Sequence, residues 1–306
     1  MGMKIGLLLA GLSNASECGR LAATAEALGF DSLWAGDHIA FPAPILDPLQ
    51  LLACFASHTQ HVRLGTCVYL LPLRHPTVTA KMVASLDFLT GGRVIFGVGV
   101  GGEFPDEFEA SGVPVAERGG RANEAIQILR TLWQGAKAGH KGRFFRFGPV
   151  QLKPPPAQPG GPPIWVGGRS TAALRRTARL GDGYVGYLLS PEGFHERMQQ
   201  IHVLQQPSKR LTAALMTFAM VDLDPKTALD TAGAILGSMY GRDMRNAAAR
   251  YCVLGTPDDC RRAVERYAEA GVEHLILAPL AYGGDVHQQI GALARALAIK
   301  PVGSAP

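Results

Sequence analysis

The feature that most constrains this chain is a regular alternation between short apolar segments and longer amphipathic ones. We expect helices between successive strands, and several begin with a helix-start signal such as Ser190-Pro191 or Thr256-Pro257. A strand, a helix and a further strand in succession are typical of a parallel sheet with helical crossovers. The expected strands lie at residues 4–9, 32–35, 62–71, 93–99, 163–167, 183–188, 211–221 and 273–278. Eight such units within 306 residues predict an α/β fold, a TIM (β/α)8 barrel rather than a doubly wound sheet.

One interval, residues 134–163, breaks this alternation between the fourth expected helix and the fifth expected strand. It contains an aromatic segment, Arg-Phe-Phe-Arg-Phe, followed by two proline-rich segments. Prolines of this kind belong at strand edges and in stiffened loops, so we expect a short hairpin followed by a rigid loop. No interdomain linker is visible elsewhere, and residues 1–306 are therefore interpreted as a single domain with one insertion.

The composition excludes several classes of protein. The net charge of +5 is scattered in pairs such as Arg175-Arg176, which favours an anionic small molecule over a nucleic acid. Five cysteines without a C-x-x-C spacing predict neither a disulfide framework nor a metal site, and they favour a reducing cytoplasm. No apolar run has the length of a membrane span. The run at residues 5–12 fits a buried first strand better than a signal peptide.

A glycine motif follows the fourth expected strand. Gly97, Gly99 and Gly102 form a G-x-G-x-x-G pattern, which in a dinucleotide-binding fold ends a strand and opens a helix. Such a fold also needs a second strand that ends in an acidic residue, and residues 103–114 contain no strand. Three interpretations remain: a dinucleotide loop, a barrel loop without a ligand, and a cofactor loop at the catalytic end of the fourth strand. We favour the third.

Other strand ends carry polar residues where a barrel binds its ligands. The second strand ends at Asp37-His38, and a carboxylate beside an imidazole can hold or protonate a substrate oxygen. The alternative is a solvated surface pair. After the third strand, Arg74 and a helix start at Pro76 form either an anion site or a simple helix cap.

The fifth strand ends in a second glycine-rich loop. Gly167 and Gly168 free the backbone to approach a ligand, and Arg169 and Ser170 precede a helix start. In a barrel this loop is next to the loop at residues 99–102. Two such loops on neighbouring strands predict a phosphorylated cofactor that lies across both.

Five segments, in this order along the chain, resemble the luciferase-like monooxygenase superfamily, and most closely its oxidoreductases that use coenzyme F420. They begin with Gly-Phe-Asp-Ser-Leu-Trp-Ala-Gly-Asp-His and occupy residues 29–38, 62–76, 86–113, 117–133 and 162–184. The resemblance extends over residues 3–190 and becomes looser beyond them. It implies a flavin- or deazaflavin-dependent barrel.

The resemblance implies roles for matched positions. His38, with Asp37 beside it, matches the active-site histidine of the F420-dependent dehydrogenases. Cys67-Val68 matches a non-prolyl cis peptide that bulges against the cofactor ring. The implied cofactor contacts are Asp37, Thr66, Cys67, Val68, Gly99, Val100, Gly101, Gly102, Gly167, Gly168, Arg169 and Ser170.

One departure from the family concerns the catalytic acid. The sugar-phosphate dehydrogenases have an acidic residue directly after the glycine loop of the fourth strand; here that position is Gly102, and Glu103 follows it. Glu103 is therefore the candidate acid, shifted by one residue, and a sugar-phosphate substrate is disfavoured.

The function we expect is a coenzyme F420-dependent oxidoreductase that transfers a hydride between the deazaflavin and a small organic substrate. The alternative is an FMN-dependent monooxygenase that uses reduced flavin and oxygen, and a third interpretation is a flavin-binding relative without activity. Later loops supply Tyr187, Met220 and Tyr282, a mostly apolar lining that favours an uncharged substrate. We expect a homodimer, with no nucleic-acid or membrane partner.

Overall fold

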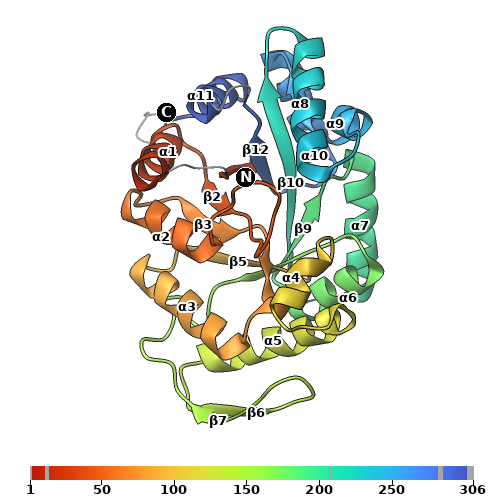
Figure 1. Cartoon of the computed structure of the whole chain (residues 1–306). Helices are drawn as coiled ribbons and strands as arrows, with labels where there is room; N and C mark the ends of the chain where they lie inside the picture. Colours follow the sequence, from red (N-terminus) through yellow and green to blue (C-terminus); the bar gives the residue numbers. More distant parts are fainter. Residues whose placement is uncertain (1, 11–13, 207, 282–284, 302–306) are drawn as a thin grey trace.

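Eight parallel strands close into a barrel in the computed structural model of the chain (Figure 1). The structure describes residues 2–10, 14–206, 208–281 and 285–301. The barrel order is β1, β2, β3, β5, β8, β9, β10 and β12, which pairs again with β1. These strands are β1 (Lys4–Leu8), β2 (Ser32–Ala35), β3 (Arg63–Thr66), β5 (Val94–Gly99), β8 (Ile164–Gly167), β9 (Gly183–Tyr187), β10 (Thr212–Val221) and β12 (His274–Pro279). The predicted TIM barrel is confirmed.

A helix follows each barrel strand, as the alternation of segments predicted. Side-chain caps fix several of the helix starts: the Ser190 hydroxyl accepts from the Gly193 amide, and Thr256 and Asp259 form a capping box. The helices are α1 (Ala15–Ala27), α2 (Pro48–Ser57), α3 (Pro76–Leu89), α5 (Arg118–Trp133), α6 (Thr171–Leu180), α7 (Pro191–Leu204), α8 (Pro225–Tyr240), α10 (Pro257–Glu269) and α11 (Val286–Ala296).

The sequence did not predict several short elements. These are α4 (Pro105–Ala110), α9 (Arg245–Tyr251), β11 (Val253–Gly255) and two 3-10 turns at Leu71–Leu73 and Val115–Glu117. Elements of three to seven residues are too short for a hydrophobic period to be recognised. The third expected strand is also interrupted, because a cis peptide at Cys67-Val68 separates β3 from β4 (Tyr69–Leu70). The resemblance had implied this cis peptide.

The insertion between α5 and β8 is the expected hairpin, formed by β6 (Ala138–Lys141) and β7 (Arg146–Val150), which projects from the barrel (Figure 1). One carboxylate on α5 closes its turn: Glu124 accepts from the backbone N–H groups of residues 143–145 and contacts His140 Nε2 at 3.0 Å. The hairpin is thus attached to a barrel helix through its turn.

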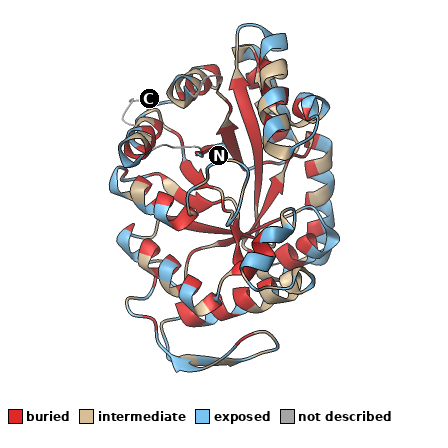
Figure 2. Ribbon diagram, in the orientation of Figure 1, coloured by how far each residue is buried: buried red, intermediate tan, exposed pale blue. Residues whose placement is uncertain are grey.

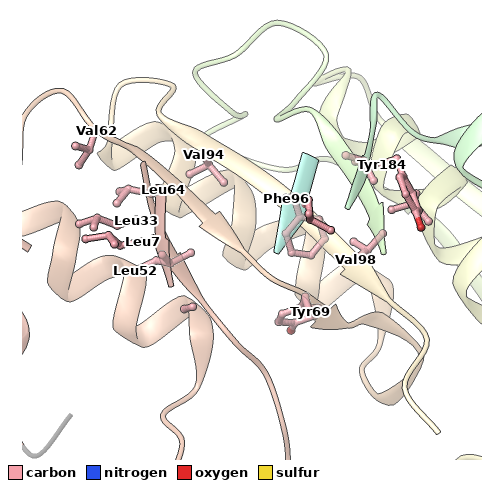
Figure 3. Packing of buried hydrophobic residues seen from close by; sticks show 14 of the residues in the cluster. Leu7, Leu33, Leu52, Val62, Leu64, Tyr69, Val94, Phe96, Val98 and Tyr184 are labelled. Carbon is pink, nitrogen blue, oxygen red and sulfur yellow. The ribbon is translucent and has the colours of Figure 1, made fainter. Parts of the chain in front are cut away.

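The main hydrophobic core is the layer between the barrel strands and the surrounding helices. In Figure 2 the barrel strands are buried, and the helices are buried on their inner faces and exposed on their outer ones. Alternate strand residues such as Leu7, Leu33 and Leu64 point into this layer and are fully buried (Figure 3). Apolar area removed from water in this layer is the main stabilising contribution to the fold.

The barrel interior, toward the end where β2 and β12 begin, holds two tryptophans and a histidine. Trp34 and Trp165 lie with ring centroids 5.2 Å apart, and both meet the edge of His274. Ser32 connects the group, since its hydroxyl accepts from Trp34 Nε1 and lies 2.7 Å from His274 Nε2. Glycine is required opposite the rings, because a Cβ at Gly65 would lie 2.2 Å from Trp34. This packed layer closes the barrel below the site.

His274 predicts an acid-sensitive stability. Burial lowers the pKa of its imidazole from 6.5 to about 3. Between these values the unfolded chain binds a proton that the folded chain does not, so stability falls as pH falls through this window. We expect a loss of about 1 kcal/mol per pH unit from this group alone. Urea unfolding of wild type and His274→Asn between pH 6 and pH 4 measures it; equal slopes for the two proteins would contradict the assignment.

Strand β10 extends beyond the rim of the barrel. Met216 pairs with Tyr187, the last residue of β9, whereas residues 219–221 of β10 pair with β11. Helices α8 and α9 pack beside this extension (Figure 1). Together with β11 they form the α8–α9 excursion, residues 222–256. Throughout the described residues, no helix combines the length and apolarity that crossing a membrane requires.

Candidate functional site

The Cys67-Val68 cis peptide lies where β3, β5 and β8 end, and glycines make room for it. A Cβ at Gly99 would lie 2.4 Å from a Val68 methyl carbon, and one at Gly167 would lie 2.9 Å from the other. A Cβ at Gly97 would overlap the Thr66 carbonyl oxygen. Two of the predicted cofactor glycines, Gly99 and Gly167, therefore have a role in packing, because they let the Val68 bulge sit between strands.

The side chains of two predicted contact residues already form hydrogen bonds with other groups of the protein. The Thr66 hydroxyl is buried and donates to the Gly97 carbonyl oxygen at 2.7 Å. The Asp37 carboxylate accepts from the Leu70 amide and from both terminal nitrogens of Arg74. Burial raises the pKa of Asp37, although Arg74 acts in the opposite direction. Both side chains hold neighbouring strand ends in place, and their contact with a cofactor stays a prediction.

Of the two interpretations given for Arg74 and the helix start at Pro76, this geometry disfavours the anion site. Its guanidinium forms a two-point ion pair with Asp37 and lies 3.6 Å from Asp47. The ring of Tyr69 also lies 4.4 Å from the guanidinium carbon. A guanidinium between two carboxylates and an aromatic face is already neutralised, so it contributes to the wall of the site.

The loop after β5 has the backbone conformation expected of an anion cradle. Gly101 and Gly102 have φ values of 61° and 110°, a region that side chains rarely adopt. Arg118, the first residue of α5, lies against this loop, since a Cβ at Gly102 would be 3.0 Å from its Nε. The sequence interpretation missed Arg118. Its signal was a basic residue at a helix start that follows the glycine loop.

The loop after β8 lies beside the first. Gly168 has a φ of 126°, and its carbonyl oxygen accepts from the Tyr184 hydroxyl at 3.1 Å. Ser170 caps α6 by accepting from the Ala173 amide. Arg169 is exposed and has no carboxylate partner within the described part of the chain. Two glycine loops with Arg118 and Arg169 therefore present backbone N–H groups and positive charge on one side of the barrel mouth.

His38 follows β2 and is held by a residue of the connection between β5 and α5, which the sequence interpretation missed. Both carboxylate oxygens of Glu107, on α4, lie 3.2 Å from His38 Nδ1. Glu107 is buried and also accepts from the Ile39 and Ala40 amides. The His38 ring is further fixed by Phe41, which stacks on it at 4.4 Å. The carboxylate partner of His38 is thus Glu107, not its sequence neighbour Asp37.

This arrangement leaves one nitrogen of His38 for chemistry. Because a carboxylate only accepts, Nδ1 carries its hydrogen toward Glu107, and Nε2 can accept or return a proton. In the part of the chain that the structure describes, Nε2 has no hydrogen-bond partner. The signal for Glu107 was a helix start at Pro105 followed by two acidic residues, within the first turn of α4.

Four predicted residues remain: Glu103, Tyr187, Met220 and Tyr282. Glu103 is exposed, and its charge acts on Tyr187 and Tyr240, which places it at the mouth. Tyr187 ends β9 and lies beside Phe218. Met220 is buried in a cluster that also contains residues of α8 and α9. Tyr282 lies outside the described residues.

Residues 4–274 match the profile of the luciferase-like monooxygenase family. The chain belongs to this family. The resemblance stated from the sequence segments is confirmed.

Curated relatives agree with this assignment. An uncharacterised protein of Mycobacterium tuberculosis is 36% identical over 185 residues, which cover 54% of this chain and 63% of the relative. An F420-dependent glucose-6-phosphate dehydrogenase of Nakamurella multipartita is 33% identical over 178 residues, covering 56% of this chain and 51% of that enzyme. These alignments span less than two thirds of either relative.

Solved structures extend the likeness over nearly the whole chain. The monooxygenase RslO1 of Streptomyces bottropensis has a TM-score of 0.83 at 25% identity, over 97% of this chain and 99% of that one. An F420-dependent secondary alcohol dehydrogenase, described in complex with an F420–acetone adduct, has a TM-score of 0.84 at 22% identity with the same coverage. The latter likeness concerns the fold alone. Both F420-dependent and monooxygenase proteins thus share this barrel.

Proposed function

We propose that this protein is a coenzyme F420-dependent oxidoreductase that transfers a hydride to or from a small organic substrate. The observation that carries the proposal is the His38–Glu107 pair at the mouth of the barrel. Interconversion of a hydroxyl and a carbonyl group by hydride transfer also requires a proton to leave or reach the oxygen. An imidazole whose Nδ1 is fixed and whose Nε2 is free can move that proton.

The residues of the mouth fit the proposed cofactor. Gly101, Gly102 and Gly168 have positive φ values, and among the described residues their N–H groups donate to no other protein group, so a phosphate could accept from them. Arg118 and Arg169 lie beside these loops, and no carboxylate forms an ion pair with either among the described residues. These five residues would hold the anionic part of F420. Bound F420 would supply the carbon that donates or accepts the hydride.

His38 and Glu107 divide the proton chemistry between them. Oxidation of an alcohol releases two electrons with one hydrogen from carbon, and a proton from oxygen. His38 Nε2 takes that proton, and Glu107 stabilises the imidazolium through Nδ1. In the reverse direction His38 returns the proton to the oxygen. Phe41 and Phe104 pack against the ring and keep it in one orientation.

The first test is the choice of cofactor. We expect F420 to bind at least about tenfold more tightly than FMN, a difference of about 1.4 kcal/mol. The reason is the greater negative charge of F420, placed beside Arg118 and Arg169. Titration of the purified protein with each cofactor measures both dissociation constants. Equal affinities, or tighter binding of FMN, would sink the proposal in favour of the alternative below.

The alternative function is an FMN-dependent monooxygenase that uses reduced flavin and oxygen. The likeness to the monooxygenase RslO1 over 97% of the chain supports it. The two functions differ in a further measurement: the monooxygenase consumes oxygen with reduced FMN, whereas the F420-dependent enzyme works in the absence of oxygen.

The assembly and location are also proposals. We propose a homodimer, because α3 exposes an apolar face whose members lie at helical spacing: Val78, Met82 and Leu89 are 57%, 36% and 78% exposed. Sedimentation equilibrium of the purified chain tests this. A cytoplasmic location is supported by the five cysteines, all of which are free thiols in the structure.

A further inference from the structure

Two tyrosine hydroxyls meet at the barrel mouth, on side chains that are far apart in the sequence. Tyr187 is the last residue of β9, and Tyr240 is the last residue of α8. Their hydroxyl groups are in direct hydrogen-bond contact. The residue after Tyr187, Leu188, has a left-handed backbone with a φ of 46°. The end of β9 and the end of α8 are thus brought together at one point.

One of the two hydroxyl hydrogens of this pair is not used in a hydrogen bond within the described part of the protein. Each tyrosine hydroxyl carries one hydrogen and can accept through its lone pairs. The contact between the two uses one hydrogen, whichever hydroxyl donates it. Across the described residues, neither hydroxyl makes another hydrogen bond. One O–H group of the pair is therefore available to an acceptor from outside the protein.

The surroundings keep both hydroxyls protonated. Burial raises the pKa of Tyr187, and the neighbouring Tyr240 and the Glu103 carboxylate act in the same direction. Burial also raises the pKa of Tyr240. At neutral pH the pair therefore donates a hydrogen bond and does not act as a base. The nearby carboxylate of Glu103 also disfavours an anionic acceptor at this position.

The pair faces His38 across the barrel. In the closed order of strands, β9 is four strands from β2 in either direction, so the ends of these two strands are diametrically opposite. Tyr187 packs beside Phe218, and both belong to a cluster that Cys67 also joins. The guanidinium of Arg169 lies 6.0 Å from the Tyr187 ring. An apolar wall with one hydroxyl donor thus stands opposite the proton-transferring imidazole.

We propose that the Tyr187–Tyr240 hydroxyl pair holds an oxygen of a neutral organic substrate, a carbonyl or hydroxyl oxygen, and thereby selects oxygen-bearing compounds. The inference rests on the proposed function, because it places a substrate between the pair and His38. The pair orients the substrate and takes no part in proton transfer. A compound of the same shape without an oxygen acceptor would leave the spare hydroxyl unsatisfied.

Two matched probes test this on the F420-loaded protein. Cyclohexanone carries a carbonyl oxygen, and methylenecyclohexane has the same shape with a carbon in its place. Dissociation constants are measured by ligand-observed NMR for wild type, Tyr187→Phe, Tyr240→Phe and the double variant. Tyr251→Phe, which removes a hydroxyl from α9, is the matched control. F420 affinity and melting temperature are recorded for every variant.

We expect the double variant to bind cyclohexanone about tenfold more weakly than wild type, a loss of about 1.4 kcal/mol. Each single variant keeps one hydroxyl hydrogen and loses less. Methylenecyclohexane binding, F420 affinity and the Tyr251→Phe control stay unchanged. Equal cyclohexanone binding in wild type and double variant overturns the proposal, as does a wild type that does not bind cyclohexanone.

Failure of the proposed role of the tyrosine pair can be distinguished from failure of the proposed cofactor. If wild type binds FMN instead of F420, the same probe series on the FMN-loaded protein still reports on the pair. If F420 binds as expected and the double variant keeps its cyclohexanone affinity, only the role of the pair fails. A parallel loss of F420 affinity in the double variant also overturns the proposal, because it would assign the pair to the cofactor.

Discussion

Replacement of His38 by alanine is expected to lower turnover by about a hundredfold or more, or about 2.7 kcal/mol of transition-state stabilisation. The reason is the loss of Nε2, the atom available to move a proton at the substrate oxygen. F420 affinity should change little, because the glycine loops follow β5 and β8, whereas His38 follows β2. The rate is followed by deazaflavin absorbance with the most active alcohol or carbonyl compound.

Two further variants make the result specific. Glu107→Gln keeps the shape of the partner but removes the charge that stabilises the imidazolium, so it should lower the rate less than His38→Ala and shift its pH profile. His195→Ala, on the exposed surface of α7, is the control for loss of a histidine and should leave the rate unchanged. If His38→Ala retains wild-type turnover, His38 has only a structural role at the mouth.

Substitution of Gly102 by valine is expected to weaken F420 binding by about 2 kcal/mol, or about thirtyfold. A Cβ here would lie 3.0 Å from Arg118 Nε, so the side chain displaces the guanidinium and covers the loop N–H groups. The positive φ also makes the substitution strained, by about 1–2 kcal/mol. A drop in apo melting temperature is therefore expected, in addition to the loss of affinity.

Gly112→Val separates strain from binding. Gly112 also has a positive φ, of 65°, but it is exposed, and a Cβ at this position would have no atom within 4 Å other than those of its chain neighbours. Both variants should lower the melting temperature, and only Gly102→Val should lower F420 affinity per folded molecule. Equal affinities in the two variants would show that the loop after β5 does not hold the cofactor.

The barrel could be predicted from the sequence because its strands are nearly continuous apolar runs. Val94–Gly99 is buried at every position, as expected of a parallel strand covered on both sides. Helix bounds followed from local signals such as Pro76 and Thr256. Strand burial and helix capping each depend on residues that are close together in the chain. Both can therefore be recognised in a single sequence.

The partners within the site could not be predicted in the same way. His38 and Glu107 are 69 residues apart, and Tyr187 and Tyr240 are 53 apart. Their meeting depends on the path of two short loops and on a six-residue helix, α4, that has no recognisable period. Sequence proximity favoured Asp37 as the partner of His38, whereas the closed barrel directs Asp37 toward Arg74.

The extension of β10 has a consequence for how proteins of this kind diversify. The two glycine loops and the His38–Glu107 pair all lie on the first half of the barrel, between β2 and α6. The α8–α9 excursion contributes Tyr240 from the other half and is anchored beyond the rim by β11. Under the proposed function, changes in the length or sequence of the excursion would alter the contact with the substrate and leave the glycine loops and the His38–Glu107 pair in place. Substrate choice and proton transfer would then depend on separate segments of the chain, and a change in one segment would leave the other unaltered.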